Sequence, residues 1–109
     1  MKRAAATLAA LSLGGWFGAA AAVASPHLLR LGRLTEGRLI VAVRAGEKRG
    51  PRVLVVGCIH GTECAGIAIV RALERVHASA DLWLVPNLNP DGYAAGSRQN
   101  GRGVDLNAN

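Results

Sequence analysis

The chain has 109 residues and a formal net charge of +6, and 50% of its residues are hydrophobic although only 4% are aromatic. Ordinary domains have about 100–150 residues, so these residues exclude more than one full domain. The arginines are scattered along the chain, and no aromatic side chains alternate with them. That pattern argues against a surface for single-stranded nucleic acid. We therefore expect one small basic domain with no nucleic-acid partner.

The first 24 residues predict a secretory signal peptide. Lys2 and Arg3 precede a long uncharged run, and ten of the first 24 residues are alanine. Ala22-Val23-Ala24 ends the run with small residues, as a signal-peptidase site requires. We expect cleavage at residue 24, so that residues 25–109 are exported to the periplasm or the extracellular space. An uncleaved N-terminal membrane anchor is the alternative, because about 20 uncharged residues can span a bilayer.

Beyond residue 24, the hydrophobic pattern predicts four strands and one helix. The strands are expected at Leu28–Leu34, Leu39–Val43, Val53–Val56 and Leu82–Val85, and the helix from about Glu63 to His77. The third strand is a continuous apolar run, which is typical of a strand buried on both faces. Strand, helix and strand within about 33 residues form a βαβ unit, so the last two strands should be parallel.

Residues 87–109 are rich in Asn and Gly and predict a long loop. A polar loop beyond the carboxyl ends of parallel strands is where α/β folds place ligand sites. One helix is too little to cover both faces of a parallel sheet. We therefore expect an α/β fold of which residues 25–109 are the first part.

His60 and Glu63 lie where the third strand gives way to the helix. Imidazole nitrogen and carboxylate oxygen both bind Zn²⁺, at about 2.0–2.2 Å. An HxxE pair alone is a weak signal, because a glutamate at the start of a helix also complements the helix dipole. Cys58 and Cys64 flank this pair, and a disulfide needs their Cα atoms within about 7 Å. We expect two buried thiols instead, because side chains on either side of a strand-to-helix turn often point apart.

Three motifs occur in order on this frame: His60-Gly61-Thr62-Glu63, then Asn89-Pro90-Asp91-Gly92-Tyr93, then the segment 97–109. Together they resemble the M14 family of zinc carboxypeptidases, in particular its bacterial branch of murein peptide amidases. The resemblance covers residues 39–109. It implies an α/β sandwich around a mixed eight-stranded sheet, with Zn²⁺ as the cofactor. It also implies hydrolysis of an amide next to a free carboxylate or a cell-wall diamino acid, with a peptide or peptidoglycan peptide as the substrate.

The resemblance also implies a role for each matching residue. His60 and Glu63 match zinc ligands, Asp105 matches the carboxylate that orients the ligand histidine, Arg98 matches the catalytic arginine that stabilises the oxyanion, and Asn107 matches an asparagine that binds the substrate carboxylate. The alternatives are a surface role for Arg98 and turn-forming roles for Asp105 and Asn107. Residues 89–92 are expected only to form a turn.

Two departures from the family pattern limit the expectation. Ala108 replaces an arginine that pairs with the substrate carboxylate, and a methyl group makes no charge-assisted contact. The family's third zinc ligand and its general-base glutamate fall beyond Asn109, so we expect residues 1–109 alone to be inactive. Neither His27 nor His77 is expected to replace that ligand. An aspartoacylase-like deacylase and a non-catalytic exported module that binds anionic wall polymers are the alternatives.

Overall fold

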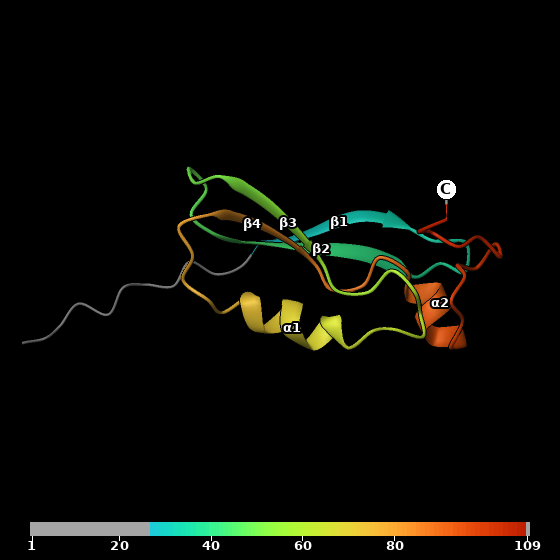
Figure 1. Cartoon of the computed structure of the whole chain (residues 1–109). Helices are drawn as coiled ribbons and strands as arrows, with labels where there is room; N and C mark the ends of the chain where they lie inside the picture. Colours follow the sequence, from blue (N-terminus) through green and yellow to red (C-terminus); the bar gives the residue numbers. More distant parts are fainter. Residues whose placement is uncertain (1–26, 109) are drawn as a thin grey trace, which may run out of the picture.

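A computed structural model describes residues 27–108 of the chain, and the predicted signal peptide lies outside them. In chain order the elements are β1 (His27–Arg33), β2 (Leu39–Gly46), β3 (Arg52–Val56), α1 (Gly66–Leu73), β4 (Asp81–Val85) and α2 (Pro90–Ala95). Helix α1 lies along one face of the sheet, and α2 lies beyond the end of the strands (Figure 1). Within residues 27–108 no helix is long and apolar enough to cross a membrane.

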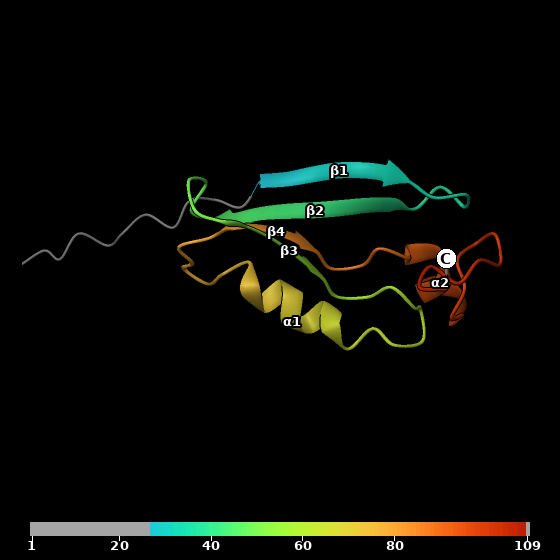
Figure 2. The same ribbon diagram turned by 45° about the horizontal axis from the view of Figure 1, so that its top comes forward.

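The four strands form one mixed sheet in the order β1-β2-β4-β3. Strand β2 pairs antiparallel with both β1 and β4, whereas β3 pairs parallel with β4 through partners such as Val55 and Leu84. Figure 2 shows α1 crossing from β3 to β4 on a single side of the sheet. The predicted βαβ unit and α/β fold class are therefore confirmed.

The core lies between the sheet and α1. Val43, Leu82 and Leu84 point from the sheet to Val70 of the helix, and Leu84 has no exposed surface. These sheet residues alternate along β2 and β4 because successive side chains of a strand point to opposite faces. By the same alternation, the side chains next to them in the sequence point to the opposite face of the sheet.

On the face away from α1, a charged cluster joins β2 to β4. Arg44 donates two hydrogen bonds to the Asp81 carboxylate, at 2.6 and 2.9 Å, and its guanidinium lies 5.1 Å from the centroid of the Trp83 ring. Trp83 donates its indole N–H to the same carboxylate at 3.2 Å. The Arg44 hydrogen bonds lower the pKa of Asp81. A buried carboxylate is thereby kept ionised and paired.

The prediction that β3 is buried on both faces is wrong for the residues described. Val53 and Leu54 are 40% and 67% exposed. Strand β3 lies at the edge of the sheet, and α1 covers only the face toward which Val55 points. No element among residues 27–108 covers the other face at Leu54.

Helix α1 is shorter than the predicted span of 63–77 and begins at Gly66. Its start is set by a close contact between backbones, because a Cβ at Gly66 would lie 2.2 Å from the carbonyl oxygen of Gly57. The connection to β4 begins soon after Leu73 and is held by the backbone N–H of Glu47, which donates to carbonyls in residues 78–80. Glu63 therefore belongs to the loop before the helix.

The second helix, α2, lies where the sequence predicted only a turn. Asn89 caps it by accepting a hydrogen bond from the backbone N–H of Gly92 at 3.0 Å, and Pro90 fills its first position. Gly96 ends it in the left-handed conformation, with φ of 60°. Asn89, Pro90 and Gly96 are all signals of helix ends. The composition of the segment, rich in Asn and Gly, nevertheless predicts a loop.

The core predicts a contrast between two leucines. Leu84→Ala should lower the free energy of unfolding by about 2–5 kcal/mol, because it opens a cavity against Val70. Leu54→Ala on exposed β3 should change it by less than about 0.5 kcal/mol. Urea unfolding followed by circular dichroism compares the two variants, and equal losses would contradict the core described above.

Candidate metal centre

The site lies at the carboxyl ends of β3 and β4. Because these strands are parallel, the segments that follow them leave the sheet at the same edge. The two segments are bonded to each other, since Gly57 donates to the Val85 carbonyl and Leu88 donates to the Cys58 carbonyl, both at 2.9 Å. Residues 57–65 and 86–89 therefore form one base for the site.

Glycine allows the next segment to pack directly on this base. A Cβ at Gly61 would lie 2.1 Å from the carbonyl carbon of Gly92 in α2. No side chain fits between two backbones at that distance, so Gly61 is required by space alone. The contact fixes the loop of His60 and Glu63 against the first turn of α2.

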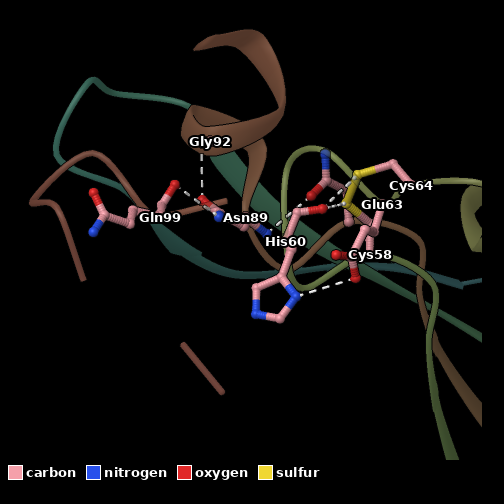
Figure 3. The surroundings of a disulfide bond; sticks show 8 residues. Cys58, His60, Glu63, Cys64, Asn89, Gly92 and Gln99 are labelled. Atoms are coloured by element: carbon pink, nitrogen blue, oxygen red, sulfur yellow. Dashed lines mark hydrogen bonds and ion pairs between the residues drawn. A yellow bond between two sulfur atoms is a disulfide. The ribbon is translucent and has the colours of Figure 1, made fainter. Parts of the chain in front are cut away.

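The His60 ring is buried and has a carboxylate on each side. Its Nε2 atom lies 2.8 Å from Oδ1 of Asp105, and its Nδ1 atom lies 3.4 Å from Oε2 of Glu63. Figure 3 shows the ring nitrogen and the Glu63 carboxylate facing each other. Thus the structure brings together three of the residues that the sequence selected.

The His60–Glu63 pair fits a metal ion. An ionised Asp105 only accepts hydrogen bonds, so Nε2 of His60 donates to it, and in the neutral ring Nδ1 then carries the lone pair. That lone pair faces another acceptor, the Glu63 carboxylate, and a cation between them satisfies both. Two ligands that are each about 2.1 Å from a tetrahedral ion lie about 3.4 Å apart, which is the separation found here.

Asp105 is the electrostatic centre of this arrangement. Its pKa is lowered to about 2, first by the backbone N–H of Asn107 and then by Arg98 and His60. Arg98 donates from Nε to Asp105 at 2.8 Å and from a terminal nitrogen to Glu63 at 3.0 Å. A carboxylate that stays ionised holds the His60 ring in one orientation and one tautomer.

Arg98 and Asn107 lie beside the pair, at the mouth of the site. The Arg98 side chain is 51% exposed, so its guanidinium is open to a ligand as well as bound to two carboxylates. Asn107 lines an open cavity of about 300 Å³ together with His60 and Glu63. Ala108 is exposed and, as the sequence indicates, offers no charge there.

Two buried residues that we expected only in a turn tie α2 to other segments, Asn89 to the loop of Arg98 and Asp91 to the turn between β1 and β2. Asn89 is fully buried, and its side-chain amide donates to the carbonyl of Gln99 at 3.2 Å. Asp91 is 1% exposed and accepts hydrogen bonds from Arg38 and from the backbone of Glu36. In the sequence, the signal for these contacts is a polar residue on each side of Pro90. Buried polar groups need hydrogen-bond partners, so such residues indicate contacts with other segments.

The prediction of two free thiols is wrong, because Cys58 and Cys64 form a disulfide with their Cα atoms 4.7 Å apart. The side chains do not point apart, because the chain doubles back between them. A hydrogen bond from the Glu63 N–H to the His60 carbonyl, at 2.9 Å, closes this turn. Both predicted ligands therefore lie within the loop that the disulfide closes.

Within residues 27–108, no group of three His, Cys, Asp or Glu side chains is placed to hold a metal ion. His27 begins β1 and His77 follows α1, and both are exposed. Among residues 27–108 the structure thus places two candidate metal ligands in one loop and, from a separate segment, a carboxylate that bonds to one of them.

Comparison with known proteins points to one family. Residues 20–109 match the sequence model described as zinc carboxypeptidase, Peptidase_M14. Carboxypeptidase Z of Rattus norvegicus is 29% identical over 112 residues, which is 72% of this chain and 17% of that protein. The chain spans about 17% of the length of each curated relative it matches.

Solved structures agree in fold. A metallo-carboxypeptidase from Burkholderia cenocepacia has a TM-score of 0.67 and 22% identity, over 79% of this chain and 28% of that chain. The murein-tripeptide amidase MpaA from Escherichia coli O157 has a TM-score of 0.59 and 28% identity, over 75% of this chain and 35% of that chain.

The glycine contact beneath the site is open to a direct test. Gly61→Ala should lower the free energy of unfolding by about 1–3 kcal/mol, because the new methyl group overlaps the backbone of Gly92. Thr62→Ala, at the exposed neighbouring position, should change it by less than about 0.5 kcal/mol. Denaturant unfolding of both variants checks this, and a Gly61→Ala chain as stable as the wild type would contradict the described contact.

Proposed function

The chain belongs to the zinc carboxypeptidase family, and we propose that it supplies two of the three protein ligands of a catalytic zinc site that hydrolyses peptide amides. One observation carries the proposal: the Nδ1 atom of His60 faces the Glu63 carboxylate at 3.4 Å while Asp105 holds the opposite nitrogen. That geometry is what a metal ligand pair with an orienting carboxylate requires.

The proposed ligands are His60 and Glu63, and a catalytic zinc site needs one more. We propose that the third ligand and the general base come from residues C-terminal to Asn109, as the family pattern implies. When bound, the metal supplies Lewis acidity toward the scissile carbonyl and lowers the pKa of a water molecule.

The residues of this chain have separate tasks in the proposed reaction. Asp105 keeps the hydrogen of His60 on Nε2, so the ring presents its lone pair on the other side. Arg98 lies against Glu63 with half of its surface exposed, where its guanidinium can donate to an oxyanion that forms at the carbonyl. Asn107 lines the same cavity and can donate its amide to a substrate carboxylate.

We propose a peptidoglycan peptide as the substrate. The likeness to a murein-tripeptide amidase supports this choice, as does the predicted export of the chain. Comparing hydrolysis of a murein tripeptide, a peptide with a free C-terminus and an N-acetyl amino acid by the full-length protein tests the choice. Faster cleavage of the N-acetyl amino acid would favour an aspartoacylase-like deacylase instead.

Zinc binding tests the proposed centre directly. The 109-residue chain should bind Zn²⁺ with a dissociation constant in the micromolar range or weaker, about −8 kcal/mol at most. His60→Ala or Glu63→Ala should abolish binding, because each removes one of two ligands. Asp105→Asn should weaken it by about 10–100-fold, because it removes only the orienting charge. Calorimetry, supported by magnetic resonance of the His60 ring for weak binding, provides the measurement.

His77→Ala is the matched control, because this exposed histidine lies after α1 and away from the site. It should leave zinc binding unchanged. Nanomolar binding by the 109-residue chain, or peptide turnover with zinc present, would show that these residues complete the site by themselves.

We also propose that residues 1–24 direct export and are then removed. Sequencing of the exported protein should find an N-terminus within a residue or two of Ser25, because the small residues at 22 and 24 form the cleavage motif. Recovery of the chain with Met1 still attached in a membrane fraction would favour the anchor instead.

A further inference from the structure

We propose that the disulfide between Cys58 and Cys64 is a positioning device that holds both metal ligands in their binding geometry. This inference rests on the proposed function, because it concerns the same His60–Glu63 pair. Its first support is location. The two cysteines are six positions apart, and both ligands lie in the loop that they close (Figure 3).

The bridge acts directly on the backbone of His60. Both sulfur atoms contact the His60 carbonyl oxygen, at 3.3 Å from Cys58 and 3.2 Å from Cys64. The same oxygen accepts the hydrogen bond from the Glu63 N–H at 2.9 Å. A rotation of the His60 peptide group would break all three contacts, so the bridge fixes the backbone from which the ring projects.

Glu63 needs this support because no helix supplies it. Helix α1 begins at Gly66, so the Glu63 backbone lies outside the helical hydrogen bonds. Its side chain is 62% exposed, and its other partner, Arg98, is 51% exposed. Exposed ion pairs restrain side chains only weakly. The bridge at Cys64, the residue after Glu63, therefore restrains this ligand through its backbone.

Cys58 anchors the loop to the sheet. It is 1% exposed, and its carbonyl accepts the hydrogen bond from Leu88 in the segment that follows β4. Cys64 precedes α1 and is only partly buried. The bridge thus ties the partly buried end of the loop to its fully buried end. A short covalent loop has few conformations to lose, so a metal ion finds the two ligands already in place.

The test compares the wild-type chain with the Cys58→Ala/Cys64→Ala double variant, with Zn²⁺ as the probe. Without metal, ¹⁵N resonances of the wild-type His60 ring should show a fixed Nε2–H tautomer, and those of the variant an average of both tautomers. Amide hydrogen exchange across residues 58–64 should be at least about 10-fold faster in the variant. Its dissociation constant for Zn²⁺ should rise by about 10–100-fold, the range for lost support of a metal ligand.

Leu84→Ala is the control, because it weakens the core and leaves the loop intact. It should keep the wild-type tautomer signal and zinc affinity in the folded chain, so a general loss of stability cannot imitate the effect. A double variant with the wild-type tautomer signal, exchange rates and affinity would overturn the inference.

Failure of the proposed function gives a different result. In that case the wild type binds no zinc at His60, while the metal-free tautomer and exchange measurements still decide whether the bridge positions the loop. If the double variant does not fold, the metal-free wild type reduced by a phosphine replaces it, read by the same two measurements. An unchanged tautomer signal after reduction would count against the inference.

Discussion

The parallel pairing of β3 with β4 is the constraint on which the rest of the site depends. It makes both strands end at one edge of the sheet, so the loop of His60 and the segment that leads to α2 start side by side. The two carboxylates that contact His60, those of Glu63 and Asp105, both belong to the segments that follow these strands. A β3 that ran in the other direction would place His60 and Asp105 at opposite ends of the sheet.

Asp105 then determines the electrostatics of the side chains that the fold brings together. One carboxylate accepts hydrogen bonds from the His60 ring, the Arg98 guanidinium and the Asn107 backbone. Because all three donors stabilise the ionised form, the group stays charged far below neutral pH and continues to accept a hydrogen bond from Nε2 of the histidine. Arg98 also contacts Glu63, so the positive and negative groups of the site restrain one another.

The sequence predicted what depends on local pattern and ordered motifs: the parallel pair of strands, the crossover helix and the positions of His60, Glu63 and Asp105 close together. It did not predict features set by contacts between distant segments. The exposure of Leu54 depends on which strand lies at the edge, and the start of α1 depends on Gly57 meeting Gly66. The Cys58–Cys64 bridge depends on a turn at His60, and spacing alone does not reveal how tightly a chain doubles back.

Chelation and orientation come from different parts of this chain. The disulfide loop carries both proposed metal ligands within seven consecutive residues, from Cys58 to Cys64. The carboxylate that orients the histidine comes from 45 residues away, on a loop that Asn89 holds by a hydrogen bond to Gln99. A transplant of the loop into another scaffold would therefore carry both proposed ligands and the bridge, and would leave behind the carboxylate that sets the tautomer of the histidine. Evolution or design could keep such a loop and exchange the partner that aligns it.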